Sequence, residues 1–582
     1  MPELSHSLSG QAAAPLAHRL RGAAIANRVG PRIAALFVIS VILVLGLLPI
    51  ARIILAAVAP GLVFDLSIVG EQWTRASTLR AMWNTLDTAF FGAVIALLIG
   101  GPFAFAVAMT DMPTRRSLGF LLLLPLIIAP QVTALSWLHM TGPSSTLLNM
   151  LGIAPAPGTP NPILGRQGII LLFGVQHAPI VFITLRAGLV GLPGDLIEAA
   201  RASGATPLRA LYTIVLPLMR PWIAGAGALA FVSGIGNFGI PALLGLPVNY
   251  LTLPTLIYRQ MSSFGPGVLP QMASLSVLIG VLALLGILAQ SFAMRGRTTR
   301  YGQGRAARIS LGQWRYPAAG LAWLLLTVVL LMPALALLTT SLVPAFGVPL
   351  TLQTMTFANF EEVLLRQAST IRAFQNSAML AGAAALILAA VAIPIAIVLE
   401  RFSTPSRRIL QGIAELPYAL PGIVLAIACI LLFLRPLPLI GSLYATAWII
   451  LIAYLMRFLT LAMKPVANAV TRIPLEFDEA AATCGASPLR RVVTITAPLA
   501  TPAAVAAALL VFMSAFNELT VSALLWSSRN ETLGVVLFSL QEAGLGPQAA
   551  AIAVATVVVV VALLAVLDRL ATRLPQGVLP WR

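Results

Sequence analysis

The sequence is poor in the residues that carry most enzyme and metal chemistry. It holds two cysteines and four histidines among its 582 residues. Cys429 lies inside an apolar run and Cys484 in a polar loop, so they predict neither a disulfide framework nor a zinc cluster. The chain also has no HExxH helix and no G-x-S-x-G elbow. We therefore expect no enzyme chemistry and no metal site in this chain.

Lysine is almost absent as well. A phosphate-binding loop of the G-x-x-x-x-G-K-[ST] kind needs a lysine, because its ammonium group contacts the nucleotide phosphates. The single lysine, Lys464, precedes Pro465 and follows none of the required glycines. The chain is therefore not a P-loop ATPase, and any ATP-driven step would need a separate protein.

Charged residues are few, and long apolar runs take their place. Charged residues make up 9% of the chain and hydrophobic residues 59%, with a mean hydropathy of +0.96. Such a chain cannot stay soluble as a globular domain. Twelve runs approach the ~20 residues needed to cross ~30 Å of hydrocarbon. They lie at 33–58, 84–109, 118–140, 169–191, 222–245, 272–293, 318–342, 376–399, 409–434, 443–465, 502–526 and 549–570. We predict an all-α integral membrane protein with about twelve transmembrane helices.

The first run resembles a signal sequence in one respect, because Ala57-Val58-Ala59 fits a small-x-small cleavage pattern. Its length and the residues before it favour an uncleaved helix. The net charge of +18 is explained by topology. With the N-terminus inside, about 26 of the basic residues fall on cytoplasmic segments, as the positive-inside rule requires. We expect both termini in the cytoplasm and no nucleic-acid partner.

The chain contains an internal repeat. A shift of 281 residues superposes Pro193–Pro221 on Pro474–Pro502 with 14 identities in 29 columns. Upstream, a shift of 292 pairs Asn84 with Asn376 and Pro102 with Pro394. Six spans per copy is an even number, so the copies share one orientation and form two parallel six-helix repeats. We expect a cytoplasmic tail at 1–32, a first half at 33–300 and a second half at 301–582, with matching polar loops at 193–217 and 474–498.

Each polar loop predicts a rigid hairpin on the cytoplasmic side. Glu198 to Ser203 favours a short helix, and Gly204 is suited to end it in a left-handed conformation. Thr206-Pro207 then reads as an N-cap with proline at the first helical position, and Ser487-Pro488 repeats this pattern.

Glu198 has two interpretations. It could close a capping box with Asp195. The second copy has Glu476, a poor N-cap, at the cap position and still keeps Glu479. The repeat therefore favours glutamates that are offered to a partner.

The two loops resemble the Glu-Ala-Ala loop of bacterial ABC importer permeases, E-A-A-x-x-x-G followed by a hydrophobic stretch and proline. The matching residues are Glu198, Ala199, Ala200, Gly204 and Pro217 in the first copy, and Glu479, Ala480, Ala481, Gly485 and Pro498 in the second. The resemblance covers most of residues 70–570, although Ala497 replaces the leucine found at Leu216 and the N-terminal tail has no match. It implies a type I ABC importer permease with both halves fused, in which each loop forms a coupling helix that inserts into an ATPase.

The same resemblance implies the partners. They are two copies of a cytoplasmic ABC ATPase that bind ATP and magnesium, a periplasmic solute-binding protein, and the bacterial inner membrane, with no cofactor in this chain. Asn237 to Gly245 and the segment near 524–538 look most like fused ferric-iron permeases. Thiamine, polyamine and aminoethylphosphonate permeases are close relatives of that group.

Two other classes fit the composition. An ion-coupled secondary transporter would use buried ionisable groups, for which the candidates are Asp87, Glu415, Arg457 and Glu518. A scaffold membrane protein would need none. Neither class requires matched cytoplasmic hairpins, which favours the importer.

If the chain is an importer, its path should be lined by polar residues of the fifth span in each half. The candidates are Ser233, Asn237, Ser514, Asn517 and Glu518. Glu518 would favour a cationic cargo such as ferric iron. A structural hydrogen bond within the bundle explains it equally well.

Overall fold

The computed structural model describes residues 32–261, 267–294, 309–400, 402–436, 438 and 441–570, and these are almost entirely helical. The first half contains α2 (Leu48–Val58), α3 (Ser67–Thr74), α4 (Ala76–Met109), α5 (Arg115–Leu122), α6 (Leu124–Ile127), α7 (Pro130–Thr141), α8 (Thr146–Met150), α9 (Arg166–Val190), α10 (Gly194–Ala202), α11 (Pro207–Ala210), α12 (Leu216–Ile235), α13 (Gly239–Leu244), α14 (Leu253–Met261) and α15 (Val268–Met294).

The second half repeats this order. It contains α16 (Arg315–Leu326), α17 (Met332–Ser341), α18 (Ala358–Glu361), α19 (Ala368–Glu400), α20 (Thr404–Ala419), α21 (Gly422–Phe433), α22 (Ala447–Val470), α23 (Leu475–Thr483), α24 (Pro488–Arg491), α25 (Ala497–Phe516), α26 (Ser522–Leu525), α27 (Leu533–Glu542) and α28 (Gly546–Leu570). The expected boundary at 300/301 and the tail before residue 32 lie outside the described residues.

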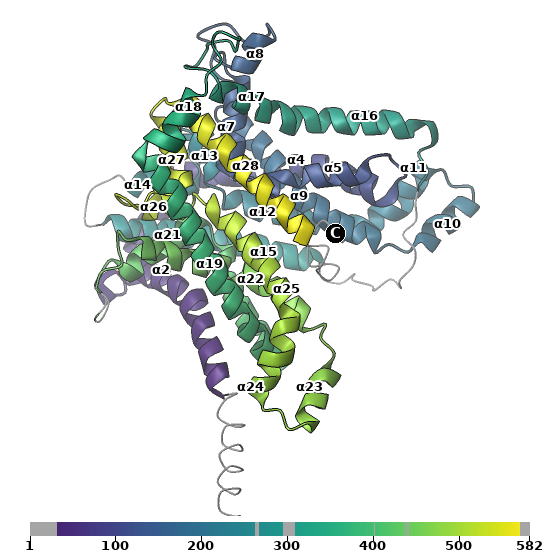
Figure 1. The fold of residues 1–582 in the computed structure, drawn as a ribbon, viewed down its shortest axis with the longest axis vertical. Coiled ribbons are helices and arrows are strands. Elements are labelled where there is room, and N and C mark those ends of the chain that lie inside the picture. Colours follow the sequence, from purple (N-terminus) through teal and green to yellow (C-terminus); the bar gives the residue numbers. More distant parts are fainter. Residues whose placement is uncertain are drawn as a thin grey trace, which may run out of the picture.

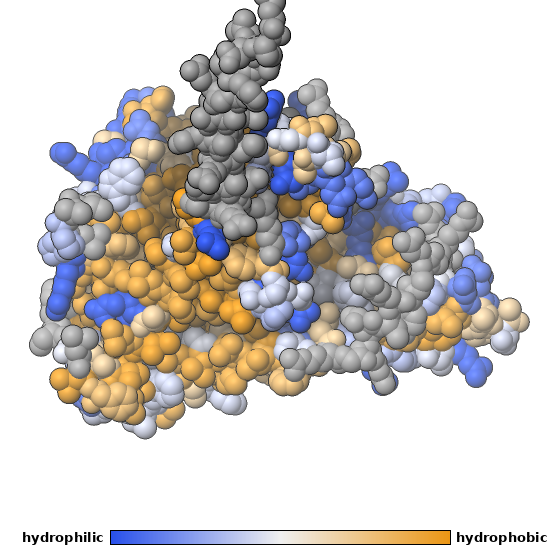
Figure 2. Space-filling view, turned by 90° about the horizontal axis from the view of Figure 1, so that it is seen from below, coloured by the Kyte–Doolittle hydropathy of each residue, from blue (hydrophilic) through white to orange (hydrophobic). Residues whose placement is uncertain are grey.

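The described residues contain ten helices long and apolar enough to cross a membrane, and two bent pairs that bring the number to twelve. The predicted all-α membrane fold is therefore confirmed. Figure 2 shows one face of the molecule, where hydrophobic residues form a broad continuous area and hydrophilic residues gather mostly at its margins.

The third and ninth spans are broken, which corrects the expectation of single helices at 118–140 and 409–434. The chain bends by 104° between the α5–α6 and α7–α8 segments, and by 102° between α20 and α21. Ala129 and Leu420 adopt extended backbone angles directly before Pro130 and Pro421. A proline disfavours helical angles at the residue before it, so each Xaa-Pro pair sets its break.

Other prolines are accommodated without a break. Wider π-helical turns occur at Leu43–Leu47, Leu211–Val215, Thr327–Leu331 and Val492–Thr496. Each ends two residues before a proline, at Pro49, Pro217, Pro333 and Pro498 respectively. Proline has no N–H and its ring clashes with the carbonyl four residues earlier, and a wider turn relieves this clash. The span therefore continues through the proline.

The halves are interleaved at their first spans. Helix α2 of the first half packs against α21 of the second, and α17 of the second half packs against α7 of the first. Figure 1 shows the remaining helices diverging from the region of α13 and α26 towards two separate ends, which carry α10–α11 and α23–α24.

The segment that enters the second half is attached to the first half. Ile309 N–H donates to the Met109 carbonyl over 2.7 Å, and Asp111 accepts hydrogen bonds from Leu311 N–H (2.9 Å) and Ser310 Oγ (3.1 Å). The backbone hydrogen bond from Leu311 lowers the pKa of Asp111, because it stabilises the charged carboxylate. These contacts fix where α16 begins relative to the end of α4.

Glycines allow α4 and α9 to pack closely. A Cβ atom on Gly100 would lie 2.5 Å from the Ala178 carbonyl oxygen, and one on Gly174 would lie 2.1 Å from Ile95 Cγ2. Neighbouring Gly101 has more room, because its Cβ would lie 3.7 Å from Leu185 Cδ1, an ordinary contact. Small residues at such positions let membrane helices approach each other.

We predict that Gly100→Ala destabilises the protein and Gly101→Ala does not. The first change forces a backbone atom to move and should cost about 1–3 kcal/mol. The second adds a methyl group at ordinary contact distance from Leu185 and gains up to about 1 kcal/mol of helix propensity. Thermal unfolding midpoints in detergent measure both, and equal midpoints for the two variants would contradict this packing.

Candidate functional site

The two polar loops form matched hairpins. Helices α10 and α23 end at Ala202 and Thr483, and the glycines that follow, Gly204 (φ +80°) and Gly485 (φ +78°), adopt the left-handed conformation predicted for both. Ala205 N–H donates to Ala200 O, and Ala486 N–H donates to Ala481 O, each over 3.0 Å. With the bonds from Gly204 N–H to Arg201 O and from Gly485 N–H to Ala482 O, these are two Schellman motifs. The same backbone geometry therefore occurs twice.

The second helix of each hairpin has the predicted side-chain cap. Thr206 Oγ1 accepts a hydrogen bond from Arg209 N–H (3.2 Å), and Ser487 Oγ accepts one from Arg490 N–H (3.4 Å). From there the chain runs without a break into the membrane spans Leu208–Ile235 and Pro488–Phe516. A displacement of either hairpin is therefore transmitted directly to the fifth span of its half.

The first helix of each hairpin starts earlier than a capping box requires. The N-cap positions are Pro193 and Pro474, so Asp195 and Glu476 lie inside the helices and the expected cap position was wrong. Proline at the N-cap fixes the extended entry of the chain. A capping box at Glu198 would need Asp195 at the N-cap position, and Asp195 does not occupy it.

Glu198 and Glu479 are exposed on these helices. Within the part of the chain that the structure describes, neither carboxylate makes a side-chain hydrogen bond or an ion pair. Ala199 and Ala480 are exposed beside them, and Ala200 and Ala481 are half-buried. Each hairpin thus presents a free carboxylate on a small-residue surface.

The hairpins differ in how their two helices are held together. In the first, Ile197 and Ala210 are buried, at 3% and 0% exposure. The shift of 281 places Asp478 and Arg491 at these positions in the second hairpin, and they form an ion pair over 2.7 Å. Two buried apolar side chains in one copy are replaced by an ion pair in the other.

The expected path residues lie near the broken spans. Ser233 is half-buried on α12 and Ser514 is exposed on α25. The two helices end at Ile235 and Phe516, so Asn237, Asn517 and Glu518 lie in the loops that follow. The expectation of continuous fifth spans over 222–245 and 502–526 was therefore wrong, and Glu518 is not on a membrane helix.

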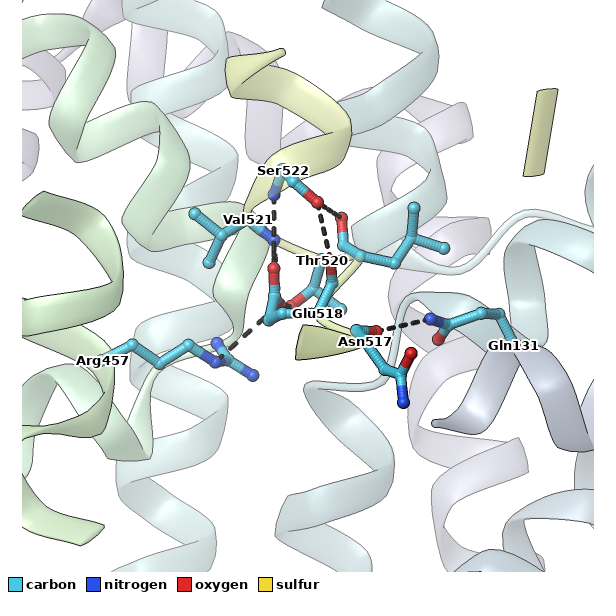
Figure 3. A network of polar contacts seen from close by, with 8 residues as sticks. Gln131, Arg457, Asn517, Glu518, Thr520, Val521 and Ser522 are labelled. Carbon is cyan, nitrogen blue, oxygen red and sulfur yellow. Dashed lines mark hydrogen bonds and ion pairs between the residues drawn. The ribbon is translucent and has the colours of Figure 1, made fainter. Parts of the chain in front are cut away.

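Glu518 is buried and held by hydrogen bonds, as Figure 3 shows. Its carboxylate accepts bonds from Val521 N–H (2.9 Å) and Ser522 N–H (3.3 Å) at the start of α26, and from the Thr520 hydroxyl. Asn237 Oδ1 makes the equivalent bond to Ile240 N–H (3.2 Å). In this conformation the side chains at both positions satisfy backbone groups in the loops, which matches the structural interpretation of Glu518.

Three further polar residues lie at the loops and breaks: Gln131 and Gln176, which were not expected at the site, and Arg457, which was expected only as an ionisable group of a secondary transporter. Gln131 Nε2 donates to the Asn517 carbonyl over 2.7 Å, and this bond joins α7 of the first half to the second half. Gln176 and Arg457 lie at equivalent positions on α9 and α22, separated by the repeat shift of 281. That shift was the signal that could have identified Gln176 and Arg457 together.

Metal-ligating residues do not gather within the described ranges, where no three His, Cys, Asp or Glu side chains could hold one ion. His139 Nε2 lies 3.3 Å from Gln541 Oε1, in hydrogen-bond contact, and the His177 ring packs against Phe173. Both histidines are thus buried and packed against neighbouring side chains.

The sequence comparisons identify the family. The family model described as "Binding-protein-dependent transport system inner membrane component" matches twice, at residues 100–296 and 392–579. The chain belongs to this permease family. The two matches agree with the internal repeat and make the chain a fused, two-half permease of an ABC importer, with multiple spans in the inner membrane.

Curated relatives align with both halves of the permease. A probable ABC transporter permease protein, y4fN, of Sinorhizobium fredii is 28% identical over 88% of this chain and 90% of its own length. The Fe(3+)-transport system permease protein FbpB 2 of Haemophilus influenzae is 22% identical over 87% of this chain and 93% of its own. The ferric transport system permease protein FbpB of Actinobacillus pleuropneumoniae is 25% identical over 83% of this chain and 69% of its own.

Solved structures match less of the chain. A bacterial alginate ABC transporter in complex with a periplasmic protein aligns with 46% of this chain and 96% of its own, at 17% identity and a TM-score of 0.38. The MetNI methionine ABC transporter aligns with 37% and 94%, at 23% identity and a TM-score of 0.30.

Family membership decides among the classes that the composition left open. The relatives are permease subunits, so the chain is a transport subunit and neither an ion-coupled secondary transporter nor a scaffold protein. The roles of the individual hairpin and loop residues are separate questions.

We predict that Arg491→Ala loosens the second hairpin and Arg490→Ala does not. The Arg491 side chain is 18% exposed and pairs with Asp478, whereas Arg490 has no ion pair among the described residues. A partly exposed pair of this kind contributes up to about 1 kcal/mol, so amide hydrogen exchange over 475–485 should rise several-fold in Arg491→Ala alone. Equal exchange in the two variants would contradict a stabilising ion pair.

Proposed function

We propose that this permease imports ferric iron and is driven by two copies of a cytoplasmic ABC ATPase that bind its two hairpins. In this proposal the ATPases hold ATP and magnesium, and a periplasmic protein delivers the solute. Both chain termini face the cytoplasm. The residues before 33, those at 33–300 and those at 301–582 are the tail and the two permease halves.

The observation that carries the coupling proposal is the pair of free carboxylates. Glu198 and Glu479 occupy equivalent positions on two hairpins with the same Schellman geometry, and neither is used inside the described protein. A short helix that ends in a rigid left-handed turn can insert into a partner without losing its shape. A guanidinium group on each ATPase would be a suitable partner for the carboxylate.

Exposed apolar side chains lie on the same two hairpins as the carboxylates. Leu208 and Leu489 occupy equivalent positions and are 62% and 73% exposed, and Leu196 and Phe477 form a second exposed pair. Such side chains on a water-facing hairpin favour burial against another protein. Gly204 and Gly485 set the turn that brings the two helices of each hairpin together.

The ferric cargo rests on relatives that span nearly the whole chain. The Haemophilus influenzae ferric permease aligns with 87% of this chain. Molybdenum permeases of Haloferax volcanii and Azotobacter vinelandii align with 43% and 36%, and a spermidine/putrescine permease of Haemophilus influenzae with 28%. Import of thiamine, a polyamine or aminoethylphosphonate is the alternative within the same architecture.

The path is proposed to pass the loops after α12 and α25. Ser233, Asn237, Ser514, Asn517 and Glu518 lie on or directly after these helices. The loops lie beside the breaks, because Asn517 accepts a hydrogen bond from Gln131 and Gly236 lies next to Pro421. Non-helical backbone in a membrane protein occurs where it is buried in protein or lines a water-filled cavity. Two such loops and two breaks close together favour a passage at this level.

We predict that Glu198→Ala combined with Glu479→Ala separates the permease from its ATPase. Each of the two substitutions removes one charged hydrogen-bonding group, whose bond typically contributes about 1.5–3 kcal/mol to binding. The amount of ATPase recovered by co-purification should therefore fall more than about tenfold. Asp195→Ala combined with Glu476→Ala is the matched control, because it removes the same charge from exposed positions on the same two helices. Equal ATPase recovery with the two double variants would contradict specific anchors.

We predict that the reconstituted complex takes up ferric iron when ATP and the ferric-binding protein of the same organism are supplied. Initial uptake rates in proteoliposomes measure this, with spermidine, thiamine, aminoethylphosphonate and molybdate as competing cargoes, each supplied with a binding protein for that solute. ATP-dependent uptake of one of these in place of iron would overturn the ferric assignment and leave the coupling proposal intact.

A further inference from the structure

The two halves of the permease differ in charge at equivalent positions. The shift of 281 that superposes the hairpins also pairs Gln176 with Arg457 and Asn237 with Glu518. In each half the first residue lies on the fourth span, α9 or α22, and the second lies in the loop after the fifth span. The first half therefore has two neutral amides where the second has a cation and an anion.

In the first half these amides satisfy backbone groups. Gln176 Nε2 donates to the carbonyls of Pro125 (2.5 Å) and Ile128 (3.3 Å), which become free where the third span breaks. Asn237 Oδ1 accepts from the backbone N–H of Ile240 at the start of α13. Backbone groups inside a membrane protein need such partners, and neutral side chains are sufficient here.

In the second half Arg457 reaches the corresponding break. Its guanidinium group lies against Gly422, the first residue of α21, so closely that a Cβ atom on this glycine would lie 2.5 Å from Arg457 Nη1. The side chains of Arg457 and Glu518 are 22% and 5% exposed, and Nε of the arginine lies 3.9 Å from Oε1 of the glutamate. Nη1 is buried and has no hydrogen-bond partner among the described residues. In the first half, neutral side chains form the hydrogen bonds that the backbone needs. The need for backbone hydrogen bonds therefore does not by itself explain why the second half has charged residues at these positions.

The charged pair lies at the junction between the halves. Asn517, next to Glu518, accepts the hydrogen bond from Gln131 of the first half, as Figure 3 shows. The corresponding loop of the first half, after α12, lies beside the ninth-span break, because a Cβ atom on Gly236 would lie 3.5 Å from Pro421. Both loops thus contact the broken span of the opposite half, where movement of the halves would open or close a passage.

We propose that Arg457 and Glu518 are a charge-balanced gate pair, in which each side chain cancels the charge of the other and so keeps the passage between the halves open to a cation. This inference rests on the proposed path. Together the two side chains have no net charge. Loss of Glu518 leaves a buried cation that repels a cationic cargo, and loss of Arg457 leaves a carboxylate that attracts it. The carboxylate keeps its bonds to Val521 and Ser522 N–H in the absence of Arg457.

The first half supplies matched substitutions for the test. Glu518→Asn and Arg457→Gln introduce the residues that the repeat already uses at these positions, and the double variant gives the second half the neutral pair of the first. The four proteins are reconstituted with the ATPase and the binding protein, and initial ferric-iron uptake is measured per ATPase. Size-exclusion elution and thermal midpoints establish that each variant is folded.

We expect Glu518→Asn to lower uptake about tenfold, because an unbalanced buried cation raises the barrier for a cation. Arg457→Gln should keep or raise the native rate. The uptake rate of the double variant should return to within about threefold of the native rate. Such a rescue is the non-additive effect by which a double-mutant cycle reveals two coupled charges.

Two results would overturn the gate pair: a double variant as impaired as the worse single variant, or four proteins with equal rates. If the native complex takes up no iron, the ferric proposal fails and the gate pair is still tested. The same cycle is then measured as uptake of the cargo that the complex does take up, and rescue by the double variant has the same meaning.

Discussion

Backbone hydrogen bonding inside the membrane is the constraint on which the centre of this protein depends. A break in a membrane span frees N–H and carbonyl groups that no water or lipid can satisfy. Prolines impose such breaks at Ala129–Pro130 and Leu420–Pro421. Gln176 satisfies carbonyls at the first break, and Asn237 and Glu518 satisfy N–H groups in the loops beside the breaks. The breaks and loops are thus stable because polar side chains satisfy them, either from another span, as Gln176 does, or from the loop itself, as Asn237 and Glu518 do.

The same constraint explains how the halves hold together. The loop at Asn517 binds Gln131 of the opposite half, and the first span of each half packs against the other half. The fifth spans, in contrast, continue from the hairpins into this central region without interruption. A force on a hairpin would therefore be transmitted to the loops that join the halves, which is the geometry that alternating access between two rigid bodies requires.

Sequence repetition predicted the fold well, because repeated features come from backbone chemistry. The left-handed turns at Gly204 and Gly485 and the caps at Thr206 and Ser487 follow from local rules and occur as predicted. Prolines were harder to interpret. Pro217 and Pro498 follow π-helical turns and leave their spans continuous, whereas Pro130 and Pro421 break their spans. The hydropathy of the sequence does not predict which of these prolines break a helix.

The candidate path was predicted less well than the hairpins. Glu518 was placed on a helix because the apolar run continues past it, but α25 ends at Phe516. Partners of Glu518 such as Arg457 come from another span, and only the three-dimensional arrangement brings them within reach. The cargo was not predictable from composition, because permeases for different solutes share the same apolar framework.

The most direct test of coupling is the distance between the two hairpins during ATP binding. Cys484 is an exposed free thiol, Cys429 is buried, and Ser203 is the exposed position equivalent to Cys484. Spin labels on Cys484 and on a Ser203→Cys variant report this distance by pulsed electron resonance in the complex with its ATPase. We expect the distance to shorten when ATP is trapped and to lengthen after nucleotide removal. An unchanged distance in both states would contradict the claim that the ATPases drive the permease through its hairpins.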